Sequence, residues 1–184
     1  MVGSPLLPDR SKESAARTLL ETERLILRQF RSSDLDAFCD LYGDAQTMRY
    51  MNGVKDREQT RRSLQGKMDH WQERGYGLWC VTRKEDSIVL GHGGLAWLEP
   101  LEQVEVAYLI GRSHWGRGYA TEVVQASLRY GFQDLGLAQI AAITWPENAA
   151  SLRVMEKCGM LYWKEVTIWD RQLVCYHIGS AKTD

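Results

Sequence analysis

The chain has 184 residues, of which 44% are hydrophobic and 26% are charged, as in an ordinary globular protein. Its 23 basic and 24 acidic residues give a net charge of −1, which points to neither a nucleic-acid nor a membrane partner. No segment approaches the roughly 18 apolar residues of a membrane-spanning helix. We expect residues 1–17, rich in Pro, Ser, Lys and Glu, to be a mobile tail, and residues 18–184 to form a single domain.

The cysteines and histidines show no spacing typical of a disulfide framework or a metal site. Cys39, Cys80, Cys158 and Cys175 contain no Cys-x-x-Cys pair, and three of them lie in apolar surroundings. This pattern predicts reduced thiols and a cytoplasmic protein. The four histidines lack metal-ligand spacing, so we expect no metal.

Hydrophobic periodicity and turn residues predict an alternation of strands and helices in the first half of the chain. Ser32, Ser33 and Asp34 supply helix-capping side chains before Leu35. In chain order, the predicted elements are a strand at 25–27, a helix from 35, a helix over about 57–73 ended by Gly75, and a hairpin of 78–82 with 87–97.

The second half continues this alternation and predicts an α+β protein. The expected elements are a strand at 103–110, a helix over about 119–135 stopped by Gly136, a strand at 140–144, a helix over 148–157 closed by Gly159, and a hairpin of 163–168 with 172–178.

The segment from Val104 to Val124 carries the strongest functional signal. An apolar strand leads into Gly116-Arg117-Gly118, and an amphipathic helix starts at once. Two glycines allow a tight turn, and a helix start offers unpaired amides and a positive dipole end to a phosphate. Tyr119-Ala120 stand where a P-loop needs Lys-Ser or Lys-Thr, and Thr121 stands where a dinucleotide fingerprint needs its third glycine.

This segment resembles the acetyl-coenzyme A signature of the GNAT superfamily of N-acetyltransferases, in particular the RimJ and RimL branch. Further matches follow in order along nearly the whole chain, namely Thr22 to Arg28, Gly91 to Leu95, and Asn148-Ala-Ala-Ser151 running to Gly159. The resemblance implies the GNAT fold, a mixed, mostly antiparallel central sheet with a splayed signature strand and about four flanking helices.

The resemblance also implies where acetyl-CoA binds. Backbone groups around Tyr108, Leu109 and Ile110 would hold the pantetheine arm. Trp115 stands where the family often has Gln or Arg. Asn148 would meet the cofactor arm, although its position is also one where a residue caps a helix. The pyrophosphate would be held by the amides of Gly116, Arg117, Gly118, Tyr119, Ala120 and Thr121. The Arg117 side chain either adds a phosphate contact or is a solvated loop charge.

The acceptor amine must lose a proton before it attacks the thioester, and the leaving thiolate must gain one. Glu105 alternates with Val104 and Val106 and is our candidate base, with Glu165 as a second choice. Many GNAT enzymes place a proton-donating Tyr four residues after Ser151, but here Met155 occupies that position. Ser151 can fill the role within the RimL-like branch, and water is the remaining option.

These features predict an N-acetyltransferase that moves an acetyl group from acetyl-CoA to a primary amine, either a protein N-terminus or a small molecule. His92 is expected to be a strand histidine rather than a catalytic one. No cysteine lies beside an activating histidine, which favours direct attack in a ternary complex. The alternative is a non-catalytic coenzyme A-binding sensor, favoured by the absence of the Tyr donor. A homodimer is plausible for the branch.

Overall fold

The computed structural model describes residues 18–180, and the tail expected at 1–17 lies outside the described residues. Eight described strands form one sheet in the order β1-β2-β3-β4-β5-β6-β8-β7. All neighbouring pairs are antiparallel except β5 and β6, which are parallel. The strands are β1 (Leu19–Glu21), β2 (Leu25–Arg28), β3 (Leu78–Arg83), β4 (Val89–Leu98), β5 (Gln103–Ile110), β6 (Gln139–Thr144), β7 (Leu161–Ile168) and β8 (Arg171–Gly179).

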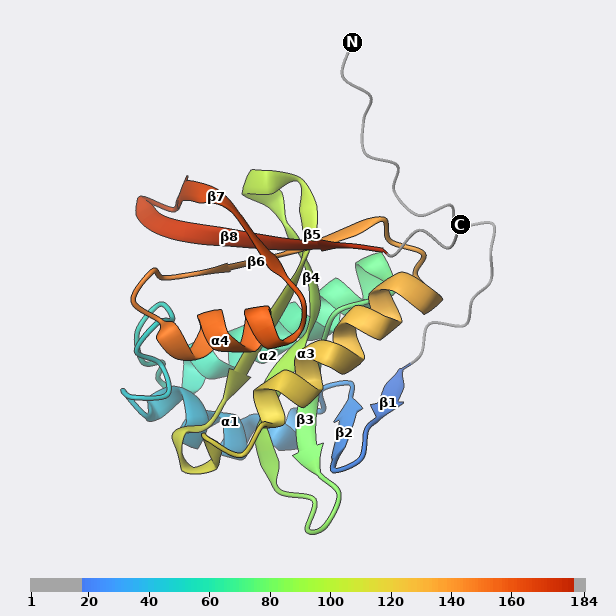
Figure 1. Cartoon of the computed structure of the whole chain (residues 1–184). Coiled ribbons are helices and arrows are strands. Elements are labelled where there is room, and N and C mark those ends of the chain that lie inside the picture. The colour runs from blue at the N-terminus through green and yellow to red at the C-terminus, as the bar shows by residue number, and fades with distance from the viewer. Residues whose placement is uncertain (1–17, 181–184) are drawn as a thin grey trace.

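Four α-helices in the described residues cover the two faces of this sheet (Figure 1). They are α1 (Leu35–Gly43), α2 (Arg57–Arg74), α3 (Tyr119–Arg129) and α4 (Ala149–Lys157). Helices α3 and α4 pack on one face, where Val123, Val124 and Met155 belong to the largest buried cluster. Helices α1 and α2 cover the other face through a cluster that includes Phe38 and Leu64. The predicted α+β architecture, with its mixed and mostly antiparallel sheet, is therefore confirmed.

Side-chain alternation along β5 distributes its residues between the two faces. Val104, Val106 and Ile110 enter the cluster beneath α3, whereas Leu109 enters the cluster beneath α1 and α2. Successive side chains of a strand point to opposite faces, so Glu105 shares the α1 and α2 face with Leu109. The sequence-based placement of Glu105 away from its two valine neighbours follows from the same alternation.

Helix α2 begins and ends as its sequence predicts. Asp56 accepts a hydrogen bond from the Gln59 amide at 2.7 Å, and Gln59 accepts one from the Asp56 amide at 2.9 Å, which forms a capping box. Gly75 ends the helix with φ at 74°. Asp34 caps no amide of α1 itself. Its carboxylate instead accepts from the Arg31 amide at 2.8 Å, at the start of the 3-10 turn Ser32–Asp34 that leads into α1, and also binds the Arg28 guanidinium at 2.7 Å.

Two features of the fold differ from the sequence-based expectation. Strand β1 was not predicted, because its three residues at the edge of the sheet are too few to show a period. Helix α3 was expected to reach about Leu135, but it ends at Arg129 and continues as a π-helical turn over Tyr130–Asp134. This turn packs directly on the sheet, since a Cβ on Gly131 would lie 2.5 Å from Cδ1 of Ile140.

Candidate active site

The predicted cleft lies between β5 and β6, which are parallel neighbours in the sheet. Their register holds at a single pair of residues, Glu105 opposite Ala141. From there to Ile110, β5 still pairs with β4 but has no partner in β6. This divergence is the splay that the resemblance implied, and it leaves backbone groups of β5 without strand partners on one side.

The three residues predicted to hold the pantetheine arm, Tyr108, Leu109 and Ile110, point their backbone groups in different directions. A Cβ on Gly91 of β4 would lie 1.9 Å from the carbonyl oxygen of Leu109, so that carbonyl faces β4. Successive peptide groups point to opposite edges of a strand, so those of Tyr108 and Ile110 face β6. The indole nitrogen of Trp115 donates to the Ile110 carbonyl at 2.6 Å. The amides of Tyr108 and Ile110 and the carbonyl of Tyr108 are therefore the groups that a ligand in the splay can use.

The loop between β5 and α3 carries two glycines in the left-handed region. φ is 73° at Gly116 and 80° at Gly118, a conformation that other residues rarely adopt. Gly118 caps α3 without a side chain, and the first helical hydrogen bond runs from the Glu122 amide to the Gly118 carbonyl at 3.1 Å. The amides of the first turn, from Tyr119 through Thr121, therefore lack intrahelical acceptors and, with the helix dipole, suit a phosphate group.

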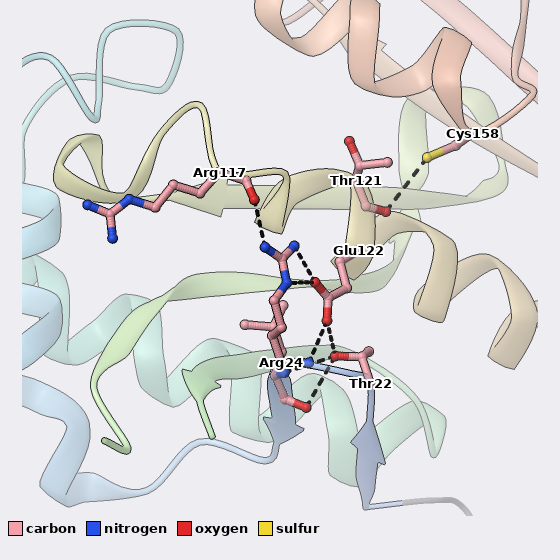
Figure 2. Close-up of polar contacts among 7 residues, drawn as sticks. Thr22, Arg24, Arg117, Thr121, Glu122 and Cys158 are labelled. Carbon is pink, nitrogen blue, oxygen red and sulfur yellow. Dashed lines mark hydrogen bonds and ion pairs between the residues drawn. The ribbon is translucent and has the colours of Figure 1, made fainter. Parts of the chain in front are cut away.

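A hydrogen-bonded ion pair ties this loop to the start of the described chain, as Figure 2 shows. Glu122, in the first turn of α3, accepts from the Thr22 hydroxyl at 2.5 Å and from the Arg24 amide at 2.9 Å. The Arg24 guanidinium lies 2.6 Å from the other carboxylate oxygen of Glu122. It also donates to the Arg117 carbonyl at 2.9 Å and lies over the Tyr119 ring, 4.7 Å from its centroid. The Thr22 to Arg28 match thus holds the glycine loop in place, a role that the sequence analysis missed.

The two remaining predicted residues of the loop contribute in different ways. The Arg117 side chain is exposed and extends away from the ion pair, so its structural role is carried by its carbonyl (Figure 2). The Thr121 carbonyl accepts a weak hydrogen bond from the Cys158 thiol at 3.8 Å, which joins the start of α3 to the end of α4. A phosphate contact of the Arg117 guanidinium remains a prediction.

A cavity of about 480 Å³ lies beside the start of α3. Gly118 and Thr121 from the glycine loop line it, together with the cations Arg24, Arg129 and Lys157. Glu23 and Glu122 also line it, and Glu122 is paired with Arg24, so Arg129 and Lys157 are the cations that can hold further anionic groups of a coenzyme A-sized ligand.

The Asn148 side chain caps α4. Its carbonyl oxygen accepts from the Ser151 amide at 3.3 Å, and its amide group donates to the Thr144 hydroxyl at 3.0 Å. The capping role that the sequence allowed is therefore present, and contact of Asn148 with the cofactor arm remains a prediction.

The Ser151 hydroxyl is not isolated. It lies 2.8 Å from the phenol oxygen of Tyr108, which also donates to the Ser151 carbonyl at 3.2 Å. Burial raises the pKa of Tyr108 to about 12, so the phenol keeps its proton at neutral pH. Met155, which stands where other family members have a Tyr, is fully buried in the core beneath α3. The Tyr108 phenol is a functional candidate that the sequence analysis missed, because only its backbone was considered.

Glu105 is the residue of β5 that pairs with β6, and the two strands diverge beyond it. Its neighbours across β4 and β6 are Ala96 and Ala141, two small residues that leave room around the carboxylate. Burial raises the pKa of Glu105 to about 7, and no described cation or hydrogen-bond donor opposes that shift. A carboxyl group with this pKa gains and loses a proton near neutral pH.

The other two titratable candidates lie in different surroundings. Glu165 is exposed on β7, the strand at the far edge of the sheet from β1, and β6 and β8 separate it from β5. His92 is buried and its Nδ1 lies 3.1 Å from the Tyr42 hydroxyl. Burial first, and then the charges of Lys67 and Lys55, hold the pKa of His92 well below its usual value. It is the neutral strand histidine that the sequence analysis expected.

Two further observations concern metal binding and membrane insertion. Residues 18–180 contain no group of three or more His, Cys, Asp or Glu side chains that could hold a metal ion. Over the same residues, no helix combines the length and apolar character needed to cross a membrane.

Comparisons with known proteins agree with this geometry. A family model described as an acetyltransferase (GNAT) domain matches residues 24–161. The "Uncharacterized protein YkkB" of Bacillus subtilis is 37% identical over 166 residues, which cover 88% of this chain and 95% of that protein. The "Uncharacterized N-acetyltransferase p20" of Bacillus licheniformis is 34% identical over 139 residues, 74% of this chain and 78% of that protein.

A solved structure supports the same assignment. The crystal structure of a GNAT-family acetyltransferase from Bacillus anthracis matches with a TM-score of 0.75 at 28% identity, and the match covers 88% of this chain and 98% of that one. The chain therefore belongs to the GNAT acetyltransferase family, and it is an acetyl-CoA-dependent N-acetyltransferase.

Proposed function

We propose that this enzyme transfers an acetyl group from acetyl-CoA to a primary amine by direct attack, with both substrates bound. The observation that carries the proposal is Glu105, a half-buried carboxyl group with a pKa of about 7 at the mouth of the splay. Acetyl-CoA supplies the activated thioester. The amides at the start of α3 suit its pyrophosphate, and the backbone of Tyr108 and Ile110 suits its pantetheine arm.

Glu105 acts as the general base in this proposal. A typical primary amine is protonated at neutral pH and cannot attack until it loses that proton. A carboxylate whose pKa lies near 7 is ionised in part at neutral pH and still basic enough to accept the proton. Glu165, our second choice, has the weaker support because it is exposed and lies three strands from β5.

Ser151 and Tyr108 act as the acid in this proposal. Their hydroxyls are 2.8 Å apart, and a proton released by Ser151 can be replaced from the Tyr108 phenol. Tyr108 and Glu105 are three residues apart in β5, so their side chains lie on opposite faces of the sheet. The base and the acid thus approach the splay from opposite faces, which suits an amine and a leaving thiol on opposite sides of the reacting carbonyl.

The cysteines support direct attack rather than an acetyl-enzyme. Burial raises the pKa of Cys80 to about 12 and the pKa values of Cys158 and Cys175 to about 11, so these groups remain thiols and poor nucleophiles at neutral pH. All four cysteines are free, which supports the proposal of a reducing, cytoplasmic location.

The narrower RimJ and RimL assignment is part of the proposal and rests on the signature segment. It makes a protein N-terminus one candidate acceptor and a small amine the other, and the homodimer stays a prediction. The alternative of a non-catalytic coenzyme A sensor rested on Met155, and the Tyr108 phenol beside Ser151 weakens that argument by offering another proton donor.

The test is thiol release from acetyl-CoA with a panel of amines, comparing wild type with Glu105→Gln and Glu165→Gln. We expect Glu105→Gln to lower kcat by about a hundredfold or more while acetyl-CoA binding, measured by calorimetry, is unchanged. Glu165→Gln is the matched control and keeps the wild-type rate. Binding of acetyl-CoA without turnover of any amine would favour the sensor, and an unchanged rate in Glu105→Gln would exclude Glu105 as the base.

A further inference from the structure

A second cavity, of about 250 Å³, lies on the face of the sheet that carries Glu105. It is lined by Ser63, Gly66, Lys67 and His70 of α2, Leu78 of β3 and Ala96 of β4. Ala96 is paired with Glu105 across β4 and β5, so the two side chains lie on the same face of the sheet. One residue of the cavity wall is therefore the cross-strand neighbour of the proposed base.

Lys67 lines this cavity without a carboxylate partner among residues 18–180. Its ammonium group bonds only to Ser63, with the hydroxyl at 2.9 Å and the carbonyl at 3.3 Å. Burial, followed by the charge of Lys55, lowers the pKa of Lys67 to about 8. A half-buried cation with no carboxylate beside it is only partly solvated, so a ligand that brings a negative charge gains a favourable interaction there.

A second cation reinforces the first. The ammonium groups of Lys55 and Lys67 lie 5.5 Å and 5.6 Å from the ring centroid of Tyr42, and neither forms an ion pair with a carboxylate in the described part of the chain. The charges of both lysines also lower the pKa of His92, after the larger effect of its burial. Two like charges near one aromatic ring repel each other, and an anion close to both relieves that repulsion.

The cavity wall also holds an unsatisfied polar atom. Nε2 of His70 is buried and has no hydrogen-bond partner within residues 18–180. His70 lies one turn from Lys67 on the same face of α2, so both can reach one ligand group. Buried polar atoms are rarely left unpaired, and an orphan beside a cation in a cavity indicates a group that completes the site.

We propose that this cavity binds an anionic group of the acceptor, so that the substrate is an amine that also carries a carboxylate or a phosphate. The inference rests on the proposed function, since it places the amine at Glu105. The substrate's ammonium then lies toward Glu105 and its anion toward Lys67, Lys55 and His70. A polyamine carries only positive charge and is a poor match for the lysines. The shape and charge of the cavity thus favour zwitterionic amines.

The test compares matched amines that differ only in the anion, namely tyrosine with tyramine and phosphoethanolamine with ethanolamine. We expect the anionic member of the preferred pair to have a kcat/KM about ten- to a hundredfold higher, the size of a charge-assisted hydrogen bond. A larger ratio of kcat/KM for the tyrosine pair indicates a carboxylate, and a larger ratio for the phosphoethanolamine pair indicates a phosphate. Equal use of both members of each pair would overturn the proposal.

Three variants and one control locate the effect. Lys67→Met is expected to lose the preference for the anionic member without changing the rate for the neutral one, and Lys55→Met is the second variant should Lys67→Met fold poorly. Gly66→Leu fills the cavity without removing a charge, since a Cβ at Gly66 meets nothing within 4 Å. Lys164→Met on exposed β7 is the matched control and keeps the preference. Equal losses for both members in Lys67→Met would make Lys67 merely structural.

A binding measurement separates this inference from the proposed function. Each amine is titrated by calorimetry into the enzyme saturated with coenzyme A, where no acetyl transfer can occur. Tighter binding of the anionic member, abolished in Lys67→Met, supports the cavity even if no amine is acetylated, and in that case only the proposed function fails. Amine turnover that depends on Glu105 but shows no anion preference in rate or binding overturns the cavity alone.

Discussion

The phenol of Tyr108 and the hydroxyl of Ser151 lie 2.8 Å apart, joining β5 to α4 across the splay. The two residues are 43 positions apart in the sequence, and neither hydroxyl occupies the family's usual Tyr position, which here is Met155. The pair forms one hydrogen-bonded unit, with a phenol that stays protonated at neutral pH behind a serine that faces the same cleft. In our proposal, the acid is therefore shared between Tyr108 on the strand and Ser151 on the helix.

The first prediction tests this pair. Tyr108→Phe and Ser151→Ala are each expected to lower kcat about tenfold to a hundredfold with little change in the KM for acetyl-CoA, because each removes a step of proton delivery. Residues that act as one unit give non-additive losses, so the double variant should be close to the worse single variant. Steady-state thiol release measures all three.

Tyr162→Phe serves as the control for this prediction, since Tyr162 is an exposed tyrosine on β7. Its kcat should equal that of wild type. Additive losses in the Tyr108 and Ser151 double variant, or an unchanged kcat in Tyr108→Phe, would mean that the hydrogen bond is only structural.

The second prediction concerns the pH dependence of the rate. Because Glu105 must be ionised to accept a proton and its pKa is raised to about 7, kcat/KM should rise with pH and level off above about 7. The pH of this rise should not change when the acceptor is replaced by an amine of different basicity. The ionisation of the amine itself produces a separate rise in kcat/KM. The first rise should be absent in Glu105→Gln. A first rise whose pH moves with the amine would belong to the substrate instead.

The third prediction is the stability consequence of the same group. Folding raises the pKa of Glu105 from about 4.5 to about 7, so the folded state holds the proton more tightly than the unfolded state. The resulting stabilisation is complete below the unfolded pKa and is lost as the pH rises through the folded pKa. Glu105→Gln cannot ionise, and its melting temperature should exceed that of wild type by more at pH 8 than at pH 5. Thermal melts at the two pH values provide the measurement.

Much of the fold could be predicted from local sequence signals. The bounds of β5 were predicted correctly because turns flank a run of apolar residues that only Glu105 interrupts. Helix α2 was predicted to within one residue because Gly75 stops it. The glycine loop was found because left-handed backbone requires a particular residue type. Signals of this kind lie within a few residues of the element that they specify.

The contacts that complete the site could not be predicted in this way. Thr22 and Glu122 are 100 positions apart, and nothing in either neighbourhood encodes their hydrogen bond. The cavity under α2 likewise depends on three elements that meet only in the fold. Asp34 shows the converse, because its sequence context predicted a cap for α1, whereas in the folded chain its carboxylate binds the Arg31 amide before that helix and the Arg28 guanidinium. Contacts with residues distant in the sequence determine the roles of these residues, whereas local sequence preferences determine the strands and loops.

The fourth prediction tests the anchor of the glycine loop. Burial raises the pKa of Glu122, but hydrogen bonds from Thr22 and Arg24 together outweigh this effect and hold the pKa below its ordinary value. Glu122→Gln keeps the shape but weakens these bonds, so we expect a several-fold higher KM for acetyl-CoA and a loss of about 1–2 kcal/mol in the free energy of unfolding. Glu58→Gln, which removes an exposed ion pair with Arg61 on α2, is the control and should change neither quantity measurably.

The last prediction separates the binding role of the glycine loop from backbone strain. Gly116 and Gly136 both have positive φ, at 73° and 65°, and at neither would a Cβ meet any atom within 4 Å. Alanine at either position should therefore lower the free energy of unfolding by a similar amount, about 1 kcal/mol. Only Gly116→Ala should also raise the KM for acetyl-CoA, because only that glycine lies where amides meet the pyrophosphate in our proposal. Chemical denaturation and steady-state kinetics on the two variants give both quantities, and equal KM values would remove the loop from the binding site.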